Sequence, residues 1–330
     1  MNTKTELLTG IRPTGSLTIA NYLGAVKPLV ELQEEGESPL VFVADLHALT
    51  DNEPDFVSEN VEKVVADYIA LGLDPEQSTI YRQSDIEGLV TTMTAFLSRH
   101  VTISQLLRLP TLKDKVGKDT RTETANALLV LYPVLMAADI LLNKAEKVPV
   151  GEDQVPHMEM ARKLARRFNK RYKEIFPVPD VHQVESLRIK SLQGDGKMSK
   201  SNPKGALFLT DDMKTVEKKI KSAVTAFEGE MSDELESHIL VAKELAETKE
   251  ERQKIDSIIE EHMNGERVMG DFKQAFTDIV QKFLKKFQSR RAEIIQDENF
   301  LPSVLREGKK VAEKNARSTL KEAKSVMHFE

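Results

Sequence analysis

The pattern of hydrophobic and polar residues divides the chain into two parts. In the first part, short apolar runs bounded by turn residues predict strands at 6–11, 39–45, 78–83, 148–150 and 187–192. Apolar residues at helical spacing fill the intervals and predict helices at about 17–36, 56–71, 87–99, 127–142 and 155–172. Because strands and helices alternate, we expect an α/β fold with a parallel, doubly wound sheet.

The second part, from about residue 206, is predicted to be entirely helical. Strand patterns stop there, and amphipathic patterns continue through 211–330 with breaks near Gly229, 265–270 and Leu301-Pro302. We therefore expect an α/β domain at 1–205 and an all-helical domain at 206–330. In the last helix, the residues that lie broadly on the apolar side are Val311, Ala316, Leu320, Ala323 and Met327. A stripe of cations lies elsewhere: Lys310, Lys314, Arg317, Lys321 and Lys324. The stripe is either a solvated face or an RNA-binding surface.

The amino-acid composition limits the kinds of function that the protein could have. The 330 residues are 40% hydrophobic and 30% charged with a net charge of -6, which is typical of a globular protein. The chain has no Cys, so disulfides and thiolate metal sites are excluded, and its seven scattered His indicate no zinc site. The N-terminus lacks an apolar signal-peptide core, and 127–142 is too short to span a membrane. We expect a cytoplasmic protein without a membrane segment.

One carboxylate stands out because it lies in the most apolar predicted helix. Asp139 has no Lys, Arg or His one helical turn away, and an ionised group taken out of water needs a partner. Tyr132, Met136 and Asp139 are spaced i, i+4, i+7 and share one helix face. This face is typical of a pocket wall for a flat ring that carries an N–H or O–H. Alternatively, Asp139 caps a neighbouring backbone turn.

Several segments could hold an anion, although both GxGxxG and GxxxxGK[ST] are absent. The turn at Arg12-Pro13-Thr14-Gly15 precedes a helix whose first turn, 18–21, offers free backbone N–H groups. The loop 194–201 presents lysines and serines, which suits either a polyphosphate or a polar surface turn. The loop 104–122, with Lys115 among its cations, is either solvated or an anion-binding flap.

The segment Gly151-Glu152-Asp153-Gln154 follows a predicted strand, at the sheet edge where ligands bind in open α/β folds. Asp153 would accept hydrogen bonds from ribose hydroxyls or cap the next helix. That helix is rich in cations, namely Arg162, Lys163, Arg166, Arg167, Lys170 and Arg171. Its basic face is either solvated or follows a phosphate backbone.

Together, PTGSLTIANYLGA, YPVLMAADILL, GEDQ and GKMSKSNP resemble the class I aminoacyl-tRNA synthetases, and in particular the bacterial tryptophanyl-tRNA synthetases. The resemblance covers nearly the whole chain. It implies a Rossmann-type catalytic domain, a helical anticodon-binding domain and a homodimer. It also implies that L-tryptophan and ATP, with Mg²⁺, form tryptophanyl-adenylate and pyrophosphate before the tryptophanyl group passes to its tRNA. Neither DNA nor a membrane is an expected partner.

The resemblance also assigns residues. Thr18-Ile19-Ala20-Asn21 stands at the HIGH motif and Lys197 to Ser201 at the KMSKS loop, and the catalytic groups would be Asn21, Lys115, Lys197 and Lys200. The implied ATP-binding residues are Arg12, Pro13, Thr14, Ala20, Asn21, Gly151, Glu152, Asp153, Gln154, Ile189, Lys197, Met198, Ser199, Lys200 and Ser201. The implied tryptophan-binding residues are Gly10, Tyr132, Met136, Asp139, Val148, Val150 and Gln154, with Asp139 accepting the indole N–H.

Three positions depart from the family's pattern. Ala20 replaces the second glycine of the HIGH motif, where glycine is usual because a ligand presses on the backbone. Leu8 stands where many relatives have Phe, and Thr111 where several have Gln. These departures bear on how ATP and the amino acid bind. The competing interpretations are a tyrosine-specific synthetase, a small-molecule nucleotidyltransferase, and a catalytically weak RNA-binding paralogue.

Overall fold

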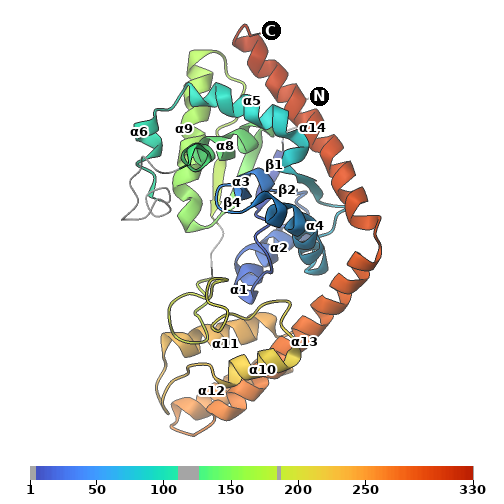
Figure 1. The fold of residues 1–330 in the computed structure, drawn as a ribbon. Helices are drawn as coiled ribbons and strands as arrows, with labels where there is room; N and C mark the ends of the chain where they lie inside the picture. The colour runs from blue at the N-terminus through green and yellow to red at the C-terminus, as the bar shows by residue number, and fades with distance from the viewer. Residues whose placement is uncertain (1–4, 111–125, 184–186, 330) are drawn as a thin grey trace.

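The first part of the chain forms a five-stranded parallel sheet with helices on both faces (Figure 1). The structure is a computed structural model that describes residues 5–110, 126–183 and 187–329. The strand order is β3-β2-β1-β4-β5, and every pairing is parallel. The strands are β1 Thr5–Ile11, β2 Leu40–Val43, β3 Thr79–Arg82, β4 Ala145–Val150 and β5 Asp180–Gln183. The predicted fold class is confirmed.

The prediction of the last strand was wrong. The fifth strand is β5, which pairs with β4 through Lys147 and Asp180, whereas 187–192 makes only an isolated bridge between Lys190 and Lys197. Residues 187–192 look like a strand because Ile189 and Leu192 are buried. Their backbone instead folds back on the next loop, since the Met198 N–H donates to the Ile189 carbonyl at 2.8 Å. The edge strand β5 was missed because its short, polar sequence has no strand pattern.

Two apolar clusters cover the two faces of the sheet. The α2 and α4 helices pack on one face, and α5, α8 and α9 pack on the other. The helices and helical turns of this part are α1 Ile19–Asn21, η1 Tyr22–Val26, α2 Lys27–Glu34, α3 Asp45–Ala48, α4 Pro54–Ala70, η2 Gln83–Ile86, α5 Glu87–Ser98, α6 Ile103–Leu106, α8 Ala127–Leu142, η4 Glu152–Gln154 and α9 Val155–Arg171. The helix predicted at 17–36 is interrupted by the π-helical turn η1.

The second part is helical as predicted, and it packs on the α2 and α4 side of the sheet (Figure 1). Its helices are α10 Met213–Lys221, α11 Asp233–Leu245, α12 Lys249–Met263, α13 Met269–Gln296 and α14 Phe300–Val326. Ion pairs that join it to the first part include Lys27 of α2 with Glu244 of α11, and Arg291 of α13 with the buried Asp67 of α4. In the described ranges, every helix is too short or too polar to cross a lipid bilayer.

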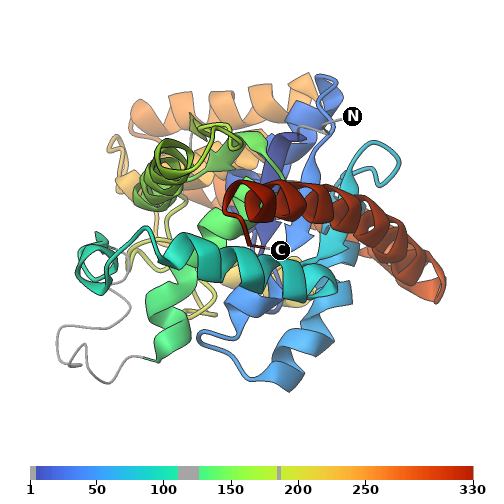
Figure 2. The same ribbon diagram turned by 90° about the horizontal axis from the view of Figure 1, so that it is seen from above.

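The last helix packs mainly on the sheet of the first part. Although α14 lies after residue 206, it runs back along the sheet beside its edge strand β3 (Figures 1 and 2). Ala312, Ala316 and Leu320 belong to the same apolar cluster as α5 and α8. Of the residues predicted for the apolar side of this helix, Ala316, Leu320 and Ala323 are buried, whereas Val311 is 44% exposed. The α14 helix is therefore physically part of the sheet-containing unit.

Gly308 allows this close approach. A Cβ atom at position 308 would lie 1.8 Å from the carbonyl oxygen of Ile80, in the middle of β3. Backbone cannot yield as a flexible side chain does, so only glycine fits at this crossing.

We expect Gly308→Ala to destabilise the protein by about 2–3 kcal/mol, because the added methyl forces α14 away from β3. The measurement is the free energy of unfolding from urea titration. Gly88→Ala in α5 is the matched control, since a Cβ there meets nothing within 4 Å. The control should be neutral or stabilising by up to about 1 kcal/mol. Equal stability of the two variants would contradict the crossing described here.

Candidate active site

A cavity of about 350 Å³ opens at the carboxyl ends of β1 and β4. Six of the seven predicted amino-acid-binding residues line it, namely Gly10, Tyr132, Met136, Val148, Val150 and Gln154. The lining also includes Leu8, Phe42, His47 and Ile140, so the wall is largely apolar with few polar groups. Such a cavity suits a flat apolar group that carries a small number of polar atoms.

Phe42 supplies an aromatic wall that the sequence analysis missed. Its ring lies against Gly10 of the neighbouring strand, where a Cβ would come within 2.6 Å of Phe42 Cζ. The absence of a side chain at Gly10 therefore makes room for the ring. Leu8 also contacts the cavity, so an aliphatic side chain stands where many relatives have an aromatic one.

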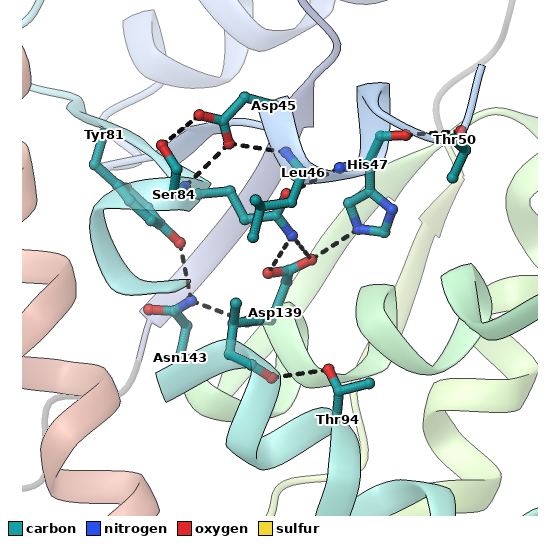
Figure 3. A network of polar contacts seen from close by, with 11 residues as sticks. Asp45, Leu46, His47, Thr50, Tyr81, Ser84, Thr94, Asp139 and Asn143 are labelled. Carbon is teal, nitrogen blue, oxygen red and sulfur yellow. Dashed lines mark hydrogen bonds and ion pairs between the residues drawn. The ribbon is translucent and has the colours of Figure 1, made fainter. Parts of the chain in front are cut away.

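The seventh predicted residue, Asp139, is fully buried and does not line the cavity (Figure 3). Its carboxylate already has partners within the protein. His47 Nε2 lies 2.9 Å from Asp139 Oδ2, and Gln83 Nε2 donates to both carboxylate oxygens at 2.9 and 2.8 Å. The partner that the sequence analysis required is therefore supplied by the protein, from residues far along the chain rather than one helical turn away. His47, which does line the cavity, stands between it and the ligand space.

The orientation of Gln83 is fixed by a second hydrogen bond. The His47 backbone N–H donates to Gln83 Oε1 at 3.3 Å, so the amide NH₂ must face Asp139. Burial raises the pKa of Asp139, and the hydrogen bond from His47 opposes that rise. Two carboxylate oxygens accept about four hydrogen bonds, and three are in use, so one acceptor position of Asp139 remains.

His47 is held in place by α3, which begins just after β2. Asp45 accepts hydrogen bonds from the backbone N–H groups of Leu46 at 2.9 Å and Ser84 at 3.0 Å, and from the Ser84 hydroxyl (Figure 3). Thr50 donates to the His47 carbonyl at 2.8 Å. These bonds tie the ends of β2 and β3 together. His47 and Gln83 follow the predicted strands at 39–45 and 78–83, and that position was the signal that could have found them.

On the opposite wall, Tyr132 contacts a buried histidine at the start of α9. The Tyr132 hydroxyl is hydrogen-bonded to His157 Nε2, and the two rings lie 4.7 Å apart. The Tyr132 ring also meets the edge of His47, with centroids 5.9 Å apart. Tyr132 is thus fixed between α8, α9 and α3.

The predicted ATP-binding turn lies at one side of the cavity. Arg12 lines the cavity and forms an ion pair with Asp51. Thr18 caps α1, because its Oγ1 accepts a hydrogen bond from the Asn21 backbone N–H at 3.2 Å. In return, Asn21 Oδ1 accepts a hydrogen bond from the Thr18 backbone N–H at 3.0 Å. This reciprocal cap occupies the carbonyl end of the Asn21 amide. The NH₂ group of the Asn21 side chain is therefore the end that is suited to donate a hydrogen bond to a ligand oxygen.

The loop 197–201 is docked on the same turn. Lys200 Nζ donates to the carbonyl oxygens of Thr14 at 3.2 Å and Gly15 at 3.0 Å. Burial lowers the pKa of Lys200. The charge of nearby Asp67 opposes this lowering of the pKa, and the charge of Arg12 increases it. The two segments are also connected farther along the chain, because the Ile19 N–H donates to the Leu207 carbonyl at 2.9 Å. Two motifs that the sequence analysis predicted to bind an anion, about 180 residues apart in sequence, therefore meet at one place, which we call the candidate anion-binding corner.

The remaining predicted residues fall into three groups. Gly151 lines the cavity, and Glu152 points away to pair with Arg188 at 2.9 Å. Ile189 and Met198 are buried beneath the loop, while Lys197 is exposed. Lys115 and Thr111 lie outside the described residues. Among the residues that the structure does describe, no cluster of three His, Asp or Glu could hold a metal ion.

Comparison with known proteins identifies the family. The family model described as tRNA synthetases class I (W and Y) matches residues 1–285. The chain belongs to this family. The class I synthetases most similar to it include the tryptophan–tRNA ligases of Porphyromonas gingivalis, 37% identical over 98% of this chain and 99% of that protein, and of Halalkalibacterium halodurans, 38% identical over 98% of each.

Solved structures of class I synthetases agree with the described fold. Tryptophanyl-tRNA synthetase from Campylobacter jejuni, complexed with ADP and tryptophan, has a TM-score of 0.83 and 31% identity, covering 98% of this chain and 99% of that one. Tyrosyl-tRNA synthetase from Aeropyrum pernix has a TM-score of 0.69 at 18% identity, covering 92% of this chain and 89% of that one, which shows the shared fold alone.

The Asp139 network makes a prediction about stability. Asp139→Ala should lower the free energy of unfolding by on the order of 3–5 kcal/mol, because it leaves the donors of His47 and Gln83 buried without an acceptor. Urea titration measures this loss. Met136→Leu on the same helix is the control and should cost less than about 1.5 kcal/mol. An Asp139→Ala protein as stable as the control would mean that the network does not hold the strand ends together.

Proposed function

We propose that this class I synthetase is an ATP-dependent ligase that joins L-tryptophan to its tRNA through a tryptophanyl-adenylate. One observation carries the proposal: an apolar cavity, whose polar His47 is held by the buried Asp139, opens beside the turn on which Lys200 is docked. An amino acid and a nucleoside triphosphate would thus meet at one edge of the sheet. Full-length similarity to tryptophan–tRNA ligases supports the same substrate.

The indole ring fits the cavity between the Phe42 and Met136 walls and the strand residues Val148 and Val150. Its N–H would be directed at the Asp139–His47 pair, where Asp139 retains one acceptor position. Because Asp139 is fully buried, a small shift of His47 or Met136 must accompany tryptophan binding. Tyr132, held by His157, and Gln154 line the wall where the amino acid's α-substituents would lie.

Adenylate formation needs little covalent chemistry from the protein. The tryptophan carboxylate is already ionised and attacks the α-phosphate of ATP directly, so no general base is needed. The protein must hold the two reactants and stabilise the charge that develops on the phosphates. The side-chain NH₂ of Asn21 and the ammonium of Lys200 are the described groups in position to do so.

Mg²⁺ accompanies ATP in this chemistry and neutralises part of the phosphate charge. The described residues supply no cluster of carboxylates for the ion, which suits a Mg²⁺ held chiefly by phosphates and water. The ribose would lie against 151–154 at the end of β4.

The tryptophanyl group would then pass to the terminal ribose of the tRNA, whose anticodon is read by the helices α10 to α13. We further propose a homodimer in the cytoplasm, which is the assembly and compartment implied by the resemblance in motifs.

The substrate prediction is tested by ATP–pyrophosphate exchange with tryptophan, tyrosine, phenylalanine and a tryptophan analogue whose indole nitrogen is replaced by sulfur. A site built around a buried acceptor rejects ligands without the donor by roughly 10⁴–10⁵-fold, so tryptophan should be preferred steeply. Comparable exchange with tyrosine would overturn the tryptophan assignment. Comparable exchange with the sulfur analogue would show that Asp139 does not recognise the indole N–H.

The role of Lys200 is tested by Lys200→Ala. Single-turnover adenylate formation should fall by about 10²–10³-fold, because a donor to developing charge is typically worth on the order of 2–4 kcal/mol. The dissociation constant for tryptophan should change only a few-fold, since the ammonium contacts the candidate anion-binding corner. Lys204→Ala, an exposed lysine just beyond the loop, is the matched control. A loss confined to tryptophan affinity would contradict the assignment.

A further inference from the structure

The buried His157 is connected to the amino-acid cavity through Tyr132. Tyr132 and Gln154 line this cavity at the carboxyl ends of β1 and β4, whereas His157 does not. The Tyr132 hydroxyl is hydrogen-bonded to His157 Nε2, and the two rings lie 4.7 Å apart with their planes at 66°. His157 thus contacts a residue of the cavity wall from behind.

Both rings are held in one orientation by their surroundings. His157 lies in the first turn of α9 and is completely buried. The Tyr132 ring, on α8, is also in contact on its other side, because the His47 ring lies 5.9 Å away at 84°. The α8 and α9 helices pack in the same apolar cluster. The Tyr132 hydroxyl therefore keeps one position on the wall, and what it offers a ligand depends on where its hydrogen points.

The hydrogen bond between Tyr132 and His157 can be made in two ways. In the first, the Tyr132 O–H donates to an Nε2 atom that carries no hydrogen. In the second, an Nε2–H group donates to the Tyr132 oxygen. The first arrangement directs the hydroxyl hydrogen at His157 and leaves the lone pairs of the oxygen for a donor. The second occupies one lone pair and directs the hydroxyl hydrogen elsewhere.

The expected ligand and the position of His157 in α9 both favour the first arrangement. The α-ammonium of an amino acid is a donor without a lone pair, so it repels a hydroxyl hydrogen that faces it. An imidazolium is unfavourable in the first turn of a helix, where the backbone N–H groups already carry partial positive charge. A neutral His157 with its hydrogen on Nδ1 satisfies both conditions.

We propose that His157 is a positioning residue that makes the Tyr132 hydroxyl an acceptor for the α-ammonium of tryptophan. This inference rests on the proposed function, because it names how the α-substituent of that substrate is selected. His157 would thereby help the site to prefer an α-amino acid over the corresponding α-hydroxy acid and over the acid that has no α-substituent. It would touch no reacting atom of adenylate formation.

The binding test uses tryptophan, indole-3-lactate and indole-3-propionate, which carry an α-ammonium, an α-hydroxyl and no α-substituent. The chain contains no Trp, so the indole fluorescence of each ligand reports its dissociation constant. In His157→Leu, the dissociation constant of tryptophan should rise about tenfold or more, as is usual when a hydrogen bond to a charged group is lost. That of indole-3-propionate should barely change. Indole-3-lactate should lose less than tryptophan, because the released Tyr132 O–H can donate to its hydroxyl oxygen.

Three further variants separate selection of the α-ammonium from packing. His157→Gln, whose Oε1 can accept in place of Nε2, should keep most of the preference for tryptophan over indole-3-propionate. Tyr132→Phe should lose that preference by itself, and adding His157→Leu to it should cause no further loss. Met158→Leu, at the next buried position of α9, is the matched control and should bind all three ligands as the parent does. Equal weakening of all three ligands in His157→Leu would overturn the proposal.

A second measurement requires neither a ligand nor a folded His157→Leu protein. In the parent with ¹⁵N-labelled histidine, the ring signals of His157 are identified by their loss in His157→Gln. The Nε2 signal should be that of a nitrogen without hydrogen, and it should shift in Tyr132→Phe. An Nε2 atom that carries a hydrogen would overturn the proposal, even for a chain that forms tryptophanyl-adenylate. A parent without tryptophan-dependent exchange would instead overturn the proposed function.

Discussion

The carboxyl group of Asp139, fully buried in an apolar interior, is the constraint on which the site depends. An isolated buried carboxylate is costly, and its three hydrogen bonds from His47 and Gln83 are what make it tolerable. Those partners come from the segments that follow β2 and β3. The hydrogen bonds to this one carboxyl group therefore fix the ends of two strands relative to α8. The apolar cavity then takes its shape from elements that the polar network has already positioned.

The candidate anion-binding corner depends on a similar connection between distant segments. Lys200 is docked on the turn at Thr14 and Gly15, and its charge also acts on the buried Asp67, which pairs with Arg291 of α13 at 2.5 Å. The helical part of the chain is thus electrostatically connected to the loop that would close over phosphates. A change in the packing of α13 would be felt at Asp67 and, through it, at Lys200.

Much of the fold could be predicted from sequence because buried strands and amphipathic helices have strong local patterns. The spacing of Tyr132 and Met136 on one helix likewise placed both side chains at the cavity. The partners of Asp139 could not be found this way, since His47 and Gln83 lie 92 and 56 residues away along the chain. Only the sheet brings them together. The strand at 180–183 was missed because an edge position requires neither a continuous apolar run nor strict alternation.

The return of α14 along β3 has a consequence for biosynthesis. The helix covers the outer edge of the sheet, and an uncovered edge strand is a template for pairing with other chains. The covering residues of α14 (Phe300–Val326) come long after β3 (Thr79–Arg82) in the chain, so a nascent chain exposes β3 and its apolar surroundings until α14 has been synthesised. A chain that stops before α14 would contain every residue of the amino-acid cavity, yet it would be prone to aggregate.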